Sequence, residues 1–141
     1  MKIIPIMLLA SAVATALACS SSSTSPSASI AGTYVLATVN GESLPAIVTN
    51  AGDTAVVVTD TLALSTSLTY TRHVVDTLRS QGSAPVLYSH ESSGTYVHTG
   101  TSITFTDGVT HGSASGTIDN GVITIASVEN GFNVTGVFDK Q

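Results

Sequence analysis

The chain has a single cysteine, Cys19, whose thiol has the most specific chemistry of any side chain in the sequence. It stands at an abrupt change in composition: an apolar run precedes it, and Ser, Thr, Ala and Pro fill residues 20–29 almost completely. Lys2 supplies a positive start, and the apolar run is too short for a permanent membrane-spanning helix. This order is typical of an export signal and predicts that residues 1–18 are a signal peptide that is removed.

The residues before Cys19 resemble the lipobox of bacterial lipoproteins, with the small residue Ala18 directly before the cysteine. In that family the cysteine becomes the new N-terminus and carries a diacylglycerol thioether and usually an amide-linked acyl chain. The resemblance therefore implies lipid attachment at Cys19 and permanent anchoring, because one acyl chain alone binds a membrane only reversibly. Ser20 stands where an aspartate retains members of the family at the inner membrane, so the resemblance implies the outer membrane if the organism has one. Residues 16–18 also fit the A-x-A site of ordinary secretion, and the alternative is a secreted protein without acyl chains.

The sequence predicts one folded domain at residues 30–141, joined to Cys19 by a flexible tether at residues 19–29. The whole chain has a net charge of −5, and loss of Lys2 with the signal makes the mature protein more acidic. This charge lacks the basic footprint of nucleic-acid-binding proteins and does not favour contact with anionic lipid headgroups. We therefore expect no nucleic-acid partner and a membrane contact through the acylated Cys19, with the protein partner unknown.

The domain is rich in Thr, Val, Ile and Tyr, and Gly, Asn or Ser interrupts it at short intervals. It shows no helical period longer than two turns, so the pattern predicts an all-β fold. Successive hairpins form an antiparallel meander, and a sheet of about eight or nine strands with one apolar face tends to close on itself. We predict a small up-and-down β-barrel, with an open or split β-sandwich as the alternative. The predicted strand segments, some of them continuous with one another, are 31–39, 44–49, 54–64, 68–79, 85–91, 93–98, 101–106, 112–118, 122–128 and 132–138.

Three Asn-Gly pairs, at residues 40–41, 120–121 and 130–131, mark tight turns, because a type I′ turn needs positive φ at both central residues. The last two turns agree on one apolar face, which supports the meander. They pair Ile118 with Ile123, Gly116 with Ile125, Ile125 with Gly136, and Ile123 with Phe138.

Two further turns, at residues 99–100 and 65–67, predict the registers upstream. They pair Tyr96 with Ile103, Gly94 with Phe105, Leu64 with Leu68, and Leu62 with Tyr70. The same loop at 65–67 places Asp60 opposite Arg72.

Two strand openings resemble those of lipocalins and fatty-acid-binding proteins. Residues 32–36 read Gly-Thr-Tyr-Val-Leu, similar to the Gly-x-Trp and Gly-Thr-Trp of those families with Tyr34 in place of Trp, and residues 94–97 repeat Gly-Thr-Tyr-Val. The sequence departs from the lipocalin pattern in its missing Trp, its lack of disulfides and its shorter chain. The resemblance implies a barrel that holds a small apolar ligand.

Arg72 is the sharpest candidate for ligand binding. It lies in the apolar phase of its strand, with Leu68, Tyr70, Val74 and Leu78. An inward cation can receive a ligand carboxylate, as internal arginines do in fatty-acid-binding proteins. The candidate ligand-binding residues are Arg72, Tyr70, Tyr34 and Tyr96. The alternative is that Asp60 neutralises Arg72 as a cross-strand pair, or that both lie where the strand leaves the barrel.

The sequence carries no enzyme or metal motif that we recognise. Residues 112–116 read Gly-Ser-Ala-Ser-Gly, but the central position of the nucleophile elbow is an alanine, and the four histidines are scattered singly. We predict no catalytic residue, no metal and no cofactor. We expect a non-catalytic lipoprotein of the cell envelope, either a module for a small hydrophobic or carboxylate ligand with an open cavity, or a structural or interaction protein with a filled core.

Overall fold

The computed structural model describes residues 29–129 and 131–141. The predicted signal peptide, Cys19 and all of the tether except Ser29 lie outside the described residues. The signal peptide, the lipid attachment and the tether therefore stay predictions. Within the described ranges, no helix is long and apolar enough to cross a membrane.

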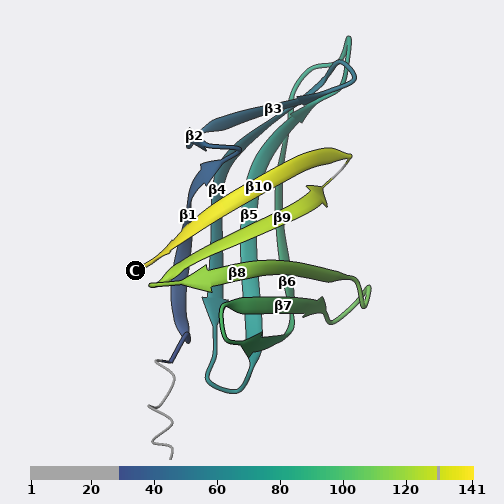
Figure 1. Cartoon of the computed structure of the whole chain (residues 1–141). Coiled ribbons are helices and arrows are strands. Elements are labelled where there is room, and N and C mark those ends of the chain that lie inside the picture. Colours follow the sequence, from purple (N-terminus) through teal and green to yellow (C-terminus); the bar gives the residue numbers. More distant parts are fainter. Residues whose placement is uncertain (1–28, 130) are drawn as a thin grey trace, which may run out of the picture.

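The described residues form ten antiparallel strands and no helix, as the all-β prediction requires. Eight of the strands, in the order β1-β10-β9-β8-β7-β6-β5-β4, close into an up-and-down barrel because β1 also pairs with β4 (Figure 1). The strands are β1 (Gly32–Val39), β2 (Glu42–Ser43), β3 (Ala46–Asn50), β4 (Asp53–Leu64), β5 (Thr69–Arg79), β6 (Val86–Thr99), β7 (Ser102–Asp107), β8 (Ser113–Asp119), β9 (Val122–Glu129) and β10 (Phe132–Lys140). The predicted segments 85–91 and 93–98 are one continuous strand, β6.

The β8-β9-β10 meander has the register that its Asn-Gly turns predict. Ile118 pairs with Ile123, and Ile125 lies between Gly116 and Gly136 on its two neighbours. At the β8–β9 turn, Asn120 and Gly121 have φ values of 48° and 80°, the left-handed region that a type I′ turn requires. Local turn chemistry therefore decides the pairing in this part of the sheet.

The two registers that were predicted upstream, for β4–β5 and β6–β7, are wrong, and each differs from the observed pairing by two residues. Tyr96 pairs with Phe105 rather than Ile103, because the β6–β7 turn is centred on residues 100–101. Leu64 pairs with Tyr70, because Leu68 adopts a φ of 62° and extends the β4–β5 loop. Leu68 is 52% exposed and does not belong to the apolar inner row. A register shift of two residues leaves all the remaining side chains on their predicted faces, since the side-chain period of a strand is two residues.

The two ends of the barrel differ in packing. The loops β4–β5, β6–β7 and β8–β9 and the start of β1 lie at one end, here called the N-terminal end; the β3–β4, β5–β6 and β9–β10 turns define the opposite, far end (Figure 1). Large side chains fill the N-terminal end, and each is less than a tenth exposed. They include Tyr34, Leu62, Tyr70, Tyr96, Ile103, Phe105, Ile118, Ile123 and Phe138.

Candidate functional site: a cleft between β6 and β9

A gap in the barrel wall opens at the far end because β7 and β8 are short. β6 pairs with β7 only from Gly94 onward, although β6 itself begins at Val86. β9 pairs with β8 only as far as Ile125, although β9 continues to Glu129. The first half of β6 and the end of β9 therefore face each other with no strand between them.

Asp107 ends β7 early. One of its carboxylate oxygens accepts hydrogen bonds from the backbone N–H groups of Val109 and Thr110, at 2.9 and 2.6 Å, and from the Thr110 hydroxyl at 2.9 Å. These bonds lower the pKa of the Asp107 carboxyl. An aspartate that bonds the backbone just after itself is a strong turn former, so the chain reverses here instead of extending the wall.

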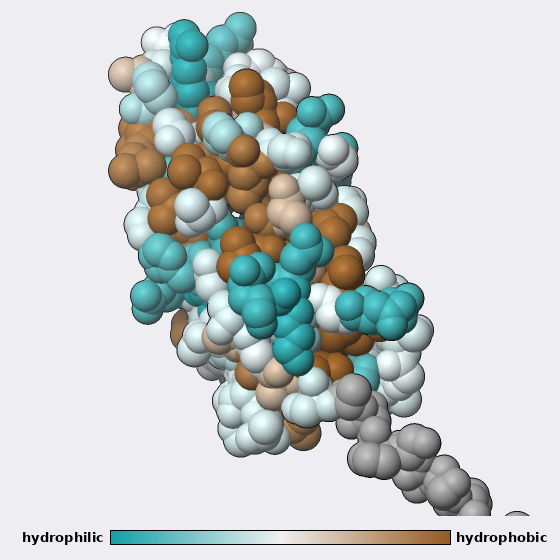
Figure 2. All heavy atoms as spheres, turned by 90° about the vertical axis from the view of Figure 1, so that its left-hand side faces the viewer, coloured by the Kyte–Doolittle hydropathy of each residue, from teal (hydrophilic) through white to brown (hydrophobic). Residues whose placement is uncertain are grey.

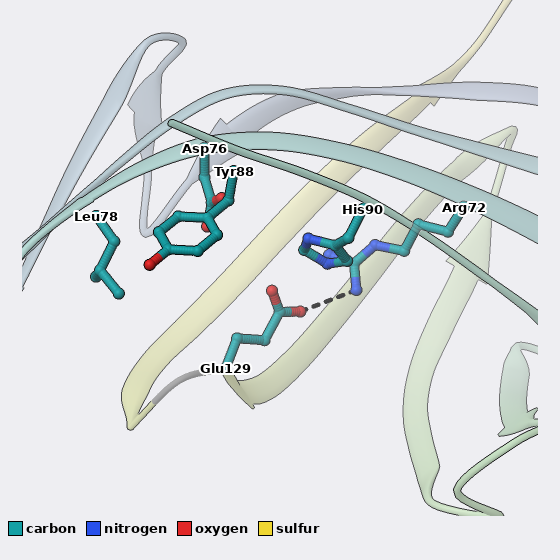
Figure 3. A pocket seen from close by; sticks show the side chains of 6 residues that line it. All are labelled: Arg72, Asp76, Leu78, Tyr88, His90 and Glu129. Carbon is teal, nitrogen blue, oxygen red and sulfur yellow. Dashed lines mark hydrogen bonds and ion pairs between the residues drawn. The ribbon is translucent and has the colours of Figure 1, made fainter. Parts of the chain in front are cut away.

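The gap leads into a cleft of about 530 Å³, which lies in the range of small-molecule binding sites. Figure 3 shows Arg72, His90 and Glu129 together on one side of the cleft and Asp76, Tyr88 and Leu78 on the other. These side chains come from three strands, with Arg72, Asp76 and Leu78 on β5, Tyr88 and His90 on β6, and Glu129 on β9.

Arg72 lies at the base of this cleft and is already bound by two carboxylates. Its Nε and Nη2 donate to Asp60, with Nη2 at 2.6 Å from Oδ2, and its Nη1 donates to Glu129 Oε1 at 2.9 Å. Asp60 is only 1% exposed. The structure therefore contains the cross-strand pair that was the alternative to a ligand-binding Arg72. The contact is diagonal, because Arg72 is opposite Leu62 in the ladder and Asp60 is opposite Val74.

Burial and charge act in opposite directions on this pair. Burial lowers the pKa of Arg72, but hydrogen bonds and charge from Asp60 and Glu129 outweigh burial and raise it. Burial raises the pKa of the Asp60 carboxyl, and the hydrogen bonds and charge of Arg72 limit that rise. Arg72 therefore stays charged at every physiological pH, and its charge is matched from within the protein.

Two of the three candidate tyrosines lie away from the cleft. Tyr34 donates a hydrogen bond from its hydroxyl to the Ile30 carbonyl at 2.6 Å, and Tyr96 donates to the Ser65 carbonyl at 2.7 Å. Burial raises the pKa of both phenols. Both hydroxyls belong to the filled N-terminal end, where backbone groups satisfy them.

Tyr70 is the candidate tyrosine nearest Arg72 in the sequence of β5, two residues away on the same inner face. Its ring packs edge-on against Phe105, with centroids 5.2 Å apart, and it is 8% exposed. The four sequence-predicted residues thus share the barrel interior, but only Arg72 lines the cleft.

The enclosed space inside the barrel is small. A second cavity, of about 40 Å³, lies between apolar side chains such as Leu36, Val74 and Phe138 and the charged groups of Asp60, Arg72, Asp76 and Glu129. That volume has room for about one water molecule. Side chains therefore occupy most of the interior, whereas the lateral cleft has room for a larger molecule.

Sequence reasoning missed Asp76, Tyr88, His90 and Glu129 as lining residues. A signal was present for two of them, because Asp76 is four residues from Arg72 and Glu129 is four from Ile125, both in the inward phase of their strands. What the alternation could not reveal is that β7 and β8 stop short, which leaves these inward positions uncovered.

His73 lies on the exposed outer face, with its ring 3.2 Å from the Ser89 hydroxyl. In the part of the chain that the structure describes, no group of three or more His, Cys, Asp or Glu is placed to hold a metal ion.

Comparison with known proteins adds no relative to these observations: no protein-family model, no curated protein and no solved structure matches the chain.

Proposed function

We propose that this protein is a lipid-anchored, non-catalytic binding protein of the cell envelope, and that its ligand site is the cleft between β6 and β9. The observation that carries the proposal is the contrast between the two ends of the barrel. Side chains fill the N-terminal end, whereas the far end opens into a cleft of about 530 Å³. The lipocalin-like resemblance of residues 32–36 supports ligand binding in a barrel, and descent from that family remains part of the proposal.

Uncovered apolar side chains on the inner face support a ligand at this place. Val86 and Tyr88 point to the inside of the barrel from β6, yet they are 50% and 47% exposed. Leu78 pairs with Val86 on the neighbouring strand and is half-buried. A bound molecule with an apolar part covers these side chains and gains free energy from the surface removed from water.

The geometry favours a ligand in this lateral cleft over a ligand whose carboxylate is held by Arg72. Nε, Nη1 and Nη2 of Arg72 each donate to a carboxylate of the protein itself. A ligand carboxylate at this guanidinium has to face Asp60 and Glu129 at close range. Its repulsion by these two groups opposes binding.

A second candidate function, protein interaction by a barrel with a filled core, is favoured by the outer face of the far end. Ile47, Val56, Thr77 and Leu87 follow one another across β3, β4, β5 and β6, all on the outer face. Ile47 and Leu87 are 66% and 68% exposed. On the side that includes β3, apolar surface gathers in the upper part of the view, above a more hydrophilic region (Figure 2). Ile47 and Leu87 at the two ends of this row are exposed apolar side chains of the kind that protein partners cover.

Native mass spectrometry of the protein purified from its own host membrane tests the binding function. We expect a mass for acyl chains on Cys19 and a second, removable mass for a ligand. Leu78→Trp fills the cleft and is expected to abolish the ligand mass, while Thr77→Trp, its outward neighbour, retains it. Wild-type protein without a removable mass, or equal retention by the two variants, contradicts the cleft as the ligand site.

A further inference from the structure

The cleft is also informative about the charge of its ligand, and the following inference rests on the proposed function. We infer that the cleft between β6 and β9 binds a small organic cation, in which an amine or guanidinium group is carried on an apolar body. The inference depends on the balance of charges around the cleft, on one buried oxygen without a partner, and on the apolar residues beside it.

Carboxylates outnumber cations at the cleft. Asp76 and Glu129 line it, and Asp60 lies directly behind Arg72. Arg72 supplies the one fixed positive charge among these residues, and the His90 imidazole and the Tyr88 phenol face the same space. Arg72 carries one positive charge against the three carboxylates of Asp60, Asp76 and Glu129 and bonds only Asp60 and Glu129, so the group keeps an excess of negative charge and Asp76 has no cation partner in the protein.

Asp76 has an acceptor that the protein leaves unsatisfied. Its Oδ1 is buried and has no hydrogen-bond partner. Among the described residues, every other buried side-chain nitrogen or oxygen has one. Buried acceptors are nearly always bonded, so an orphan at the edge of a cleft needs an explanation. A ligand N–H donor supplies the missing bond, and a cationic donor also compensates the charge.

Tyr88 is the nearest aromatic neighbour of this carboxylate across the β5–β6 ladder. It is opposite Asp76 in the β5–β6 ladder, and its ring lies beside the Asp76 carboxylate in Figure 3. The ring is nearly half exposed, so it is free to turn aside at little packing cost. An aromatic face next to a carboxylate is also favourable for a cation, through attraction to the ring quadrupole.

The neighbouring side chains favour an apolar body for the ligand. Leu78 and Tyr88 line the cleft beside Asp76, and Val86 continues the same inner face. A bare metal ion gains nothing from these residues, and no metal cluster was found in the described ranges. An amine with an aromatic or aliphatic body satisfies both the carboxylates and the apolar wall.

Three probes that share one skeleton test the inference: 4-phenylbutylamine, 4-phenylbutanol and 4-phenylbutyrate. Isothermal titration calorimetry on the full mature protein measures their affinities in one buffer at low ionic strength. We expect the amine to bind most tightly and the carboxylate least. Asp76→Asn should weaken amine binding about tenfold, the scale of one charge-assisted hydrogen bond, and leave the alcohol almost unchanged.

Asp119→Asn is the matched control, because it removes one negative charge from the exposed β8–β9 turn at the N-terminal end. It should bind the amine as the wild type does. Added salt should weaken the binding of the amine more than the binding of the alcohol. Thermal unfolding of both variants checks that the fold is intact.

The outcomes separate the two proposals. If the alcohol binds as tightly as the amine, or if Asp76→Asn has no effect while Leu78→Trp abolishes binding, the cleft is the site but the preference for cations is wrong. If none of the three probes binds, or if Leu78→Trp leaves binding unchanged, the proposed function fails together with the inference.

Discussion

At the scale of single residues, Arg72 shows how the same side chain changes meaning once its neighbours are known. On the strand it is a cation among apolar residues, which is compatible with a ligand site. In the folded protein it bonds Asp60 and Glu129, which come from two other strands. Its first role is therefore to neutralise buried acid, and the excess negative charge of the cleft is carried by three carboxylates around this one cation, with Asp76 left unpaired.

Arg72→Met is expected to reduce the free energy of unfolding by about 3–5 kcal/mol, because it leaves the Asp60 carboxylate buried without its partner. Urea denaturation measures the loss. Adding Asp60→Leu should restore part of it, since no lone charge then remains inside. Arg79→Met, at an exposed position, should change stability by less than about 0.5 kcal/mol. Equal losses in the two arginine variants would show that the pair does not stabilise the barrel.

At the scale of the strands, two inward glycines allow close approach of neighbouring backbones. A Cβ on Gly116 would overlap the backbone oxygen of Thr124 on β9, and one on Gly94 would overlap that of Thr106 on β7. Gly116 also leaves room for Ile125, as the sequence pattern predicts. These positions let short strands coil tightly around the filled end of the barrel.

Gly116→Ala should therefore lower the free energy of unfolding by about 1–3 kcal/mol, because β8 and β9 have to separate to admit the methyl group. Gly112→Ala is the matched control, since its Cβ meets only the Thr110 hydroxyl, at 3.3 Å. Thermal unfolding compares the two. A Gly116→Ala protein as stable as Gly112→Ala would mean that the strands are not held this close.

At the scale of the whole molecule, the attachment point of the chain and the cleft belong to different ends of the barrel. The described chain begins at Ser29, beside the N-terminal end (Figure 1), whereas residues of β5, the first half of β6 and the end of β9 line the cleft. The proposed lipid anchor at Cys19 would therefore join the barrel at the end away from the cleft. The cleft is left accessible to a ligand in the surrounding solution.

If the proposed anchor is correct, Cys19→Ser should move the protein from the membrane fraction to the soluble fraction without changing its thermal stability, because the described strands of the barrel begin at Gly32. Ser20→Ala keeps the thiol and should stay in the membrane fraction. Western blotting after fractionation and intact mass measurement provide the test. A wild-type mature mass without acyl chains would support ordinary secretion instead, and would leave the fold and the cleft unaffected.

The sequence alone determined what depends on local chemistry and on the two-residue period of a strand. Asn-Gly turns predicted the register around Ile123 and Ile125, and alternation predicted that Tyr34, Tyr96 and Phe138 lie inside a closed barrel. Both signals act within a few residues, so a single sequence is sufficient to read them.

Only the tertiary structure decided where the barrel is filled and where it is open. The bond of Arg72 to Glu129 on β9 and the exposed inner face at Tyr88 both depend on how far β9 and β6 run past the ends of β8 and β7. Such a relation joins residues far apart in the chain, and it follows from strand length and stagger around the whole barrel. No local pattern carries it, so the cleft became visible only in the folded molecule.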